Sequence, residues 1–159
     1  MPGGMDHLSP PGTTAETDLE LLAVPGSVKV AGGILVLTGV FTVLIGLQIW
    51  GLLTVVGPIK LVAPLAVALG ASAVVLGAGV ARARLAAASI GLGLAPVIAL
   101  FGLVWFSFAL LNGVLSMISL AVLPLAGVST ILIATSRARV KRVEEARQRL
   151  RAEGLDAGL

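Results

Sequence analysis

Long apolar runs, separated by short polar breaks, make up most of this chain. A helix needs roughly 20 apolar residues to cross the hydrocarbon core of a bilayer. Four runs meet that length, and they predict membrane-spanning helices at 28–50, 59–81, 86–111 and 113–135. The breaks are too short for an extramembrane domain, so successive helices should run in opposite directions. The pattern therefore predicts an all-α integral membrane protein with an antiparallel four-helix transmembrane bundle.

The two ends of the chain have a different composition. Residues 1–27 are rich in Pro, Gly and Thr, which predicts a disordered cytoplasmic leader. Within it Thr17-Asp18-Leu19-Glu20 has the form of a helix capping box, so a short interfacial helix is one alternative there. Residues 136–159 combine basic side chains with Val140, Val143, Ala146 and Leu150 at helical spacing, which predicts a basic amphipathic tail helix.

Composition and charge support membrane insertion and set an orientation. Apolar residues make up 57% of the chain, charged residues only 12%, and the mean hydropathy is +1.07, values typical of a membrane protein. With the N-terminus inside, ten Lys and Arg residues lie on the cytoplasmic side and Lys60 alone lies outside. This bias predicts an N-in, C-in protein. Arg outnumbers Lys amid abundant Ala, Gly and Val, which favours a bacterial source. The expected location is therefore the bacterial cytoplasmic (inner) membrane.

Small residues recur in the spans with a period near 3.5. Such a repeat keeps one face of a helix toward its partner, and small residues allow two backbones to approach closely in lipid. The predicted packing positions are Gly32, Gly39, Gly46, Gly70 and Gly77. Whether these faces point into the bundle or toward another protomer is open at this stage.

The first two spans also share a pattern. The order Val-x-x-Gly-x-x-x-Val-x-x-Gly begins at Val36 and recurs from Val67. An inverted repeat that arose by duplication and convergence on one packing solution are both consistent with it.

The chain is poor in the groups that carry chemistry. No Asp or Glu occurs in the 123 residues between Glu20 and Glu144, the chain has no Cys, and its single His is His7 in the leader. Catalytic acid–base pairs, metal sites and proton relays are usually built from these residues. We therefore predict no enzymatic activity, no cofactor and no metal.

The remaining polar candidates are basic. Arg82 and Arg84 lie between the second and third spans, and the tail opens with Arg137, Arg139, Lys141 and Arg142. Basic residues beside a membrane attract anionic headgroups, so these six are predicted to contact lipid or a partner. A plain topology signal is the alternative. Because topology accounts for the positive charge, no nucleic-acid partner is expected.

Two functional hypotheses follow. The first is a structural or accessory membrane protein that assembles with itself or with a larger membrane complex through its small-residue faces. The second is a small oligomeric pore or facilitator for an ion or a small neutral solute, since a pore needs no buried charge.

Overall fold

Four helices account for nearly all of the described residues. The computed structural model describes residues 23–52, 62–111 and 117–152, and within these ranges it contains no strand. The helices are α2 (Gly26–Leu52), α3 (Val62–Ala81), α4 (Leu85–Leu111) and α5 (Met117–Ala152). All four are long and apolar enough to cross a membrane. The predicted all-helical class and the four apolar spans are thereby confirmed.

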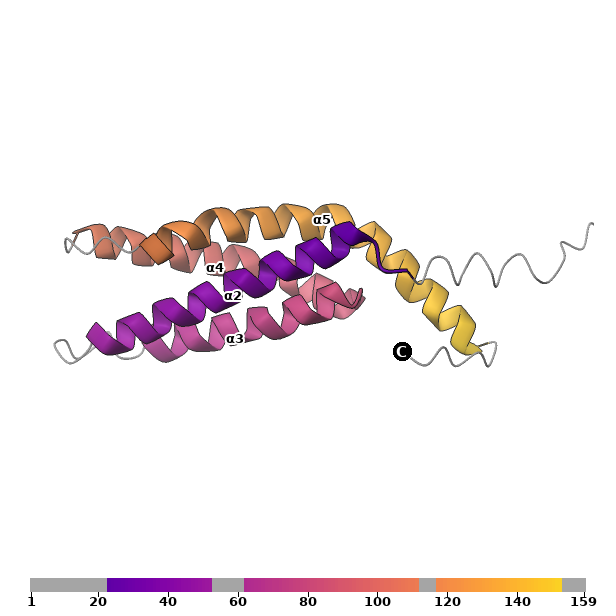
Figure 1. The fold of residues 1–159 in the computed structure, drawn as a ribbon, viewed down its shortest axis with the longest axis horizontal. Helices are drawn as coiled ribbons and strands as arrows, with labels where there is room; N and C mark the ends of the chain where they lie inside the picture. Colours follow the sequence, from indigo (N-terminus) through magenta and orange to yellow (C-terminus); the bar gives the residue numbers. More distant parts are fainter. Residues whose placement is uncertain (1–22, 53–61, 112–116, 153–159) are drawn as a thin grey trace, which may run out of the picture.

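The helices lie side by side along most of their length (Figure 1). α2 packs most extensively against α3 and also along α5, and α4 packs mainly against α5. Because α2 has neighbours on several sides, it is the most buried of the four helices. The predicted leader up to residue 22, the predicted starts of the second and fourth spans, and residues 153–159 lie outside the described residues.

The fourth span and the tail form one helix rather than two. We expected a boundary near residue 135, but α5 continues from Met117 through Ala152. The reason is local: residues 136–152 contain neither Gly nor Pro, so nothing in the backbone ends the helix where its composition changes from apolar to basic. In Figure 1 the yellow part of α5 extends beyond the ends of the other helices. The basic segment 136–152 is therefore a direct continuation of the helix of the fourth span.

The backbones of α2 and α3 approach each other at successive glycines. A Cβ atom added to Gly39 would lie 2.5 Å from the carbonyl oxygen of Gly70, and one added to Gly70 would lie 2.6 Å from that of Gly39. Gly32 and Gly77 face each other in the same way, at 2.6 and 2.8 Å. No side chain fits at such distances. From the first pair to the second the residue number rises on α2, from Gly32 to Gly39, and falls on α3, from Gly77 to Gly70. These two helices therefore run in opposite directions.

The shared Val/Gly pattern gives this interface an approximate two-fold symmetry. A Cβ on Gly39 would meet Val74, and a Cβ on Gly70 would meet Val43, which is the residue equivalent to Val74 in the other copy of the pattern. The outer positions repeat this exchange, with Gly46 against Val67 and Gly77 against Val36. Each copy thus supplies the glycines that receive the valines of the other copy. The repeat encodes a self-complementary surface.

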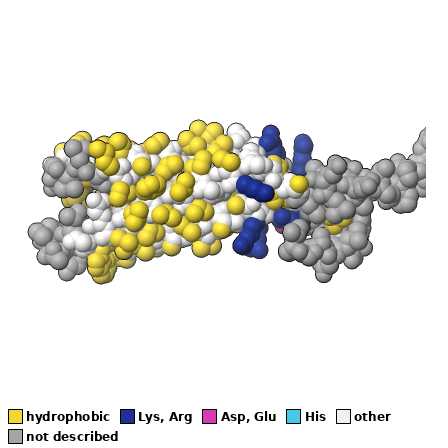
Figure 2. Space-filling model, in the orientation of Figure 1, with side chains coloured by type: hydrophobic (Ala, Val, Ile, Leu, Met, Phe, Trp, Pro, Cys, Tyr) yellow, Lys and Arg dark blue, Asp and Glu magenta, His cyan; other side chains and the backbone are white. Residues whose placement is uncertain are grey.

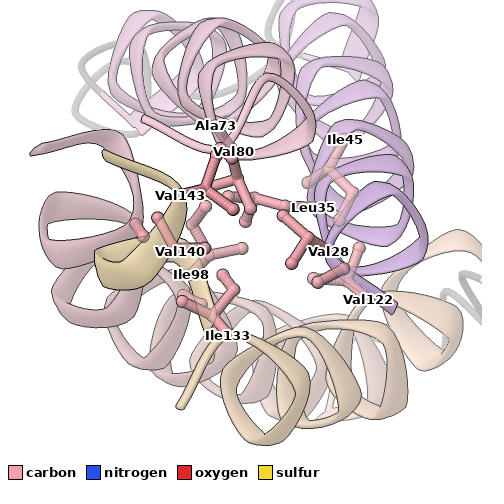
Figure 3. Close-up of a cluster of buried hydrophobic side chains, with 14 of the residues drawn as sticks. Val28, Leu35, Ile45, Ala73, Val80, Ile98, Val122, Ile133, Val140 and Val143 are labelled. Atoms are coloured by element: carbon pink, nitrogen blue, oxygen red, sulfur yellow. The ribbon is translucent and has the colours of Figure 1, made fainter. Parts of the chain in front are cut away.

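The centre of the bundle lies where all four helices meet at a glycine of α4. A Cβ on Gly91 would lie 3.2 Å from Leu35 of α2, 3.6 Å from Ile133 of α5 and 3.9 Å from Val80 of α3. These three side chains are almost fully buried and point into the space between the helices (Figure 3). At this level α4 places no side chain in the core, and the side chains of the other three helices pack against its glycine.

The outer surface is more apolar than a soluble protein would tolerate. Large side chains are well exposed around the bundle, including Val75 at 71% and Ile131 at 63%. Figure 2 shows hydrophobic side chains spread along the body of the bundle and Lys and Arg gathered near one end. Soluble monomers rarely expose apolar patches of this extent. The surface fits lipid along the body and water or headgroups at the end.

Candidate functional site

The turn between α3 and α4 carries two arginines and has a well-defined backbone. The N–H of Ala83 donates to the carbonyl of Val80 at 2.8 Å, and the N–H of Arg84 donates to that of Gly79 at 3.1 Å. These two bonds form a Schellman motif, which normally ends on a residue in the left-handed region. Ala83 takes that position with φ of 54°, and its side chain is fully buried. Arg82 and Arg84 thereby flank a fixed, buried residue.

The same turn starts α4 without a capping side chain. Arg84 acts as the N-cap, because its carbonyl accepts a hydrogen bond from the N–H of Ala88 at 3.1 Å. A guanidinium has no acceptor, so it cannot bond to the free amides of the first turn, and that turn holds no acidic residue. The positive end of the helix dipole adds to the charge of the two arginines.

The second half of α5 passes over this turn. Arg147 donates from Nη1 to the carbonyl oxygen of Arg82 at 3.0 Å. Val140 and Val143 of α5 are buried in the same apolar core as Ala83 and Val80. The apolar face of the predicted tail helix thus packs, at these two valines, on its own bundle. Only its basic face remains for contacts outside the chain.

Between α5 and the turn lies a pocket of about 640 Å³. Four arginines line it, together with one acid, one amide and a few apolar residues: Arg82, Arg84, Arg147, Arg151, Glu144, Gln148, Val24, Ala81, Leu85 and Ala86. We call it the basic pocket, and the end of the bundle that carries it the basic end. The Nε atom of Arg147 is buried and has no hydrogen-bond partner among the described residues. With four arginines and one acid, the lining of the pocket is predominantly positive.

The sequence-predicted contact residues fall into two groups. Arg82 and Arg84 line the basic pocket. The other four are exposed on α5 outside it. Of these, Arg139 donates to the hydroxyl of Ser27 at 3.0 Å, and Lys141 lies 3.7 Å from Glu145. The remaining two are Arg137 and Arg142.

Sequence reasoning missed the α5 side of the pocket. Arg147 and Arg151 were counted only among the basic residues of the tail, and Glu144 and Gln148 were given no role. The spacing of these four residues, by three, one and three positions, places them on one face of a helix. That spacing was the available signal. It did not reveal that the face meets a turn 65 residues earlier in the chain.

The predicted packing glycines lie between α2 and α3 rather than on the outer surface. Gly32, Gly39, Gly46, Gly70 and Gly77 each face the partner helix of this pair. They bring two helices of the same chain together. A second copy of the chain cannot use them while this hairpin is intact.

Three hydroxyls inside the bundle bond within their own helices. Thr38 donates to the carbonyl of Ile34 at 2.8 Å, Thr42 to that of Thr38 at 2.7 Å, and Ser129 to that of Ala126 at 2.9 Å. Such bonds satisfy a buried hydroxyl without leaving it free for a solute. These three residues therefore act in packing.

The described residues contain no cluster of three or more His, Cys, Asp or Glu that suits a metal ion. The lining of the basic pocket sets four guanidinium groups beside one carboxylate, a combination that suits an anion. No family model matches the chain, and neither a curated protein nor a solved structure matches it.

Proposed function

We propose that this chain is a non-enzymatic structural or accessory protein of a bacterial cytoplasmic membrane. In this proposal it crosses the membrane as an antiparallel four-helix bundle with both termini in the cytoplasm. Its basic end contacts anionic lipid, and it joins a second copy or a larger membrane complex. The charge bias of ten basic residues against one supports this orientation.

The observation that carries the proposal is how polar groups are distributed. The interior is filled by apolar side chains and by backbones in contact at glycines, and three of its buried hydroxyls bond to their own helix. Charged groups of the described helices gather at the basic end (Figure 2). This distribution suits a protein that packs and anchors, rather than one that moves protons or catalyses a reaction.

Assembly must then use surfaces other than the glycines of α2 and α3. Those glycines are covered within the chain, whereas the outer faces of α3 and α4 expose large apolar side chains such as Val75 and Leu100. In lipid, association through such faces depends on shape and small residues rather than on hydrophobicity. A partner that buries these faces is compatible with the intact bundle.

The second hypothesis, a small pore, predicts a measurable flux. A polar lining for it would come from Asn112, Ser116 and Ser119, of which the first two lie outside the described residues. Because the described interior is apolar, we expect proteoliposomes containing the full chain to leak K⁺, Cl⁻, water and glycerol no faster than empty liposomes. Stopped-flow light scattering and ion-sensitive dyes measure these rates. A protein-dependent flux that rises with protein density would replace the structural proposal with the pore.

A further inference from the structure

We propose that the basic pocket is a specific binding site for one phosphate group, presented by a lipid headgroup or by a soluble phosphate compound. The inference deepens the proposed contact of the basic end with anionic lipid and rests on it. It replaces a diffuse electrostatic attraction by a site with defined residues. Arg82 and Arg84 come from the α3–α4 turn, and Arg147 and Arg151 come from α5.

The charge of the pocket requires a counter-charge. Four guanidinium groups face one carboxylate, Glu144, across a single hollow. Like charges held together by two rigid elements repel each other unless an anion or solvent lies between them. Arginine binds phosphate particularly well, because its planar fork of donors matches the oxygens in a bidentate contact. Glu144 lowers the net charge without cancelling it, which favours a small anion over a polyanion.

One of the pocket arginines carries a donor that no described residue satisfies. The buried Nε of Arg147 has no partner among the described residues, while Nη1 of the same side chain is fixed to the carbonyl of Arg82. A buried donor without an acceptor is costly and usually has a ligand or water to satisfy it. Leu85 and Ala86 also line the pocket and belong to the first turn of α4, whose amides have no partner within the helix.

The frame around these donors is rigid. The Schellman motif fixes the turn, Ala83 is buried beneath it, and Val143 anchors α5 in the core beside it. The arginines are thus carried by elements whose relative position is set by packing. A site built in this way binds with less entropic loss than basic side chains on a free tail.

The position of the pocket explains why a lipid is one source of the phosphate. Ala81 and Leu85 are the last and first residues of two apolar helices, and both line the pocket. Headgroups lie at the depth where apolar helices end. The apolar lining from Val24, Ala81 and Leu85 would meet the glycerol end of a lipid, whereas a soluble phosphate would use only the arginines.

The test compares two double variants with the same change in charge. Arg84→Gln with Arg151→Gln removes two pocket arginines, neither of which holds the α5–turn hydrogen bond. Arg137→Gln with Arg142→Gln removes two exposed arginines outside the pocket. Native mass spectrometry of the full chain in mild detergent counts bound phosphatidylglycerol, with phosphatidylcholine as the uncharged control. Circular dichroism verifies that each variant is folded.

We expect one phosphatidylglycerol to be retained per chain. The pocket variant should weaken its binding by about tenfold or more, and the control variant by no more than about twofold. For the soluble source, inorganic phosphate is titrated against chloride at equal ionic strength. It should then raise the thermal midpoint of the wild type but not of the pocket variant.

Three results separate the claims. Selective loss in the pocket variant with either probe supports the site, and the probe identifies the source. Equal weakening by both double variants overturns the pocket but leaves the general contact with anionic lipid. If the wild type binds neither probe, both the pocket and the proposed lipid contact are wrong.

Discussion

Replacing Gly39 with leucine should separate α2 from α3 and destabilise the protein by about 3 kcal/mol, the upper end of the usual cost of overpacking. The first atom of the new side chain would already lie 2.5 Å from the carbonyl oxygen of Gly70 and 2.8 Å from the backbone nitrogen of Val74. Backbone atoms cannot move aside as a flexible side chain can, so the helices themselves must part. Steric trapping or thermal unfolding in detergent, followed by circular dichroism, measures the loss.

Gly33 provides the matched control for this experiment. It lies in the same helix, and a Cβ atom added there meets nothing within 4 Å. Gly33→Leu should therefore change the free energy of unfolding by no more than about 0.5 kcal/mol, as exposed substitutions usually do. If Gly39→Leu and Gly33→Leu were equally stable, the close approach of α2 and α3 would be wrong.

Leu35→Ala should cost about 2–5 kcal/mol, because it empties the point where the four helices meet. Leu35 is fully buried and reaches toward Gly91, Ile133 and Val80. Leu37, two residues later and 50% exposed, is the control, and Leu37→Ala should be nearly neutral. The comparison separates the cost of lost internal packing from the cost of removing an apolar side chain that faces lipid. The free energy of unfolding of both variants is measured as for Gly39→Leu.

A double-mutant cycle makes this prediction more specific. A Cβ atom on Gly91 would lie 3.2 Å from Cδ2 of Leu35, so alanine at 91 crowds the wild type but fills part of the void left by Leu35→Ala. We expect Gly91→Ala to be less harmful, or stabilising, in the Leu35→Ala background, with a coupling of about 0.5–3 kcal/mol. Strictly additive effects would place these two residues apart and contradict the packing described.

The four spans could be predicted from sequence because lipid imposes one simple requirement on length and polarity. The ends at Ala81 and Leu111 agree with the sequence prediction. The sequence placed the end of the fourth span near residue 135, but the helix itself continues, because a change from apolar to basic residues marks the edge of the bilayer and not the end of a helix. Backbone geometry depends on Gly, Pro and caps, and α5 has no helix-ending signal between residues 136 and 152.

The glycine spacing indicated contact faces but could not identify their partner. The partner of a contact face depends on which two helices pair, and only the structure places Gly39 opposite Gly70. The α5 side of the basic pocket was hidden for a similar reason. Arg82 and Arg147 are distant in sequence, and nothing local shows that α5 crosses the α3–α4 turn. Even the shape of the turn was unexpected, since alanine at Ala83 takes the position that glycine usually holds.

The proposed accessory role is tested most directly by purifying the tagged full chain from its native membrane in mild detergent and weighing the intact assembly by native mass spectrometry. The account predicts a defined assembly, either of several copies or with a stoichiometric membrane partner, in which each chain keeps its α2–α3 hairpin. A chain recovered only as a monomer, with no co-purifying protein under conditions that preserve other membrane complexes, would contradict it.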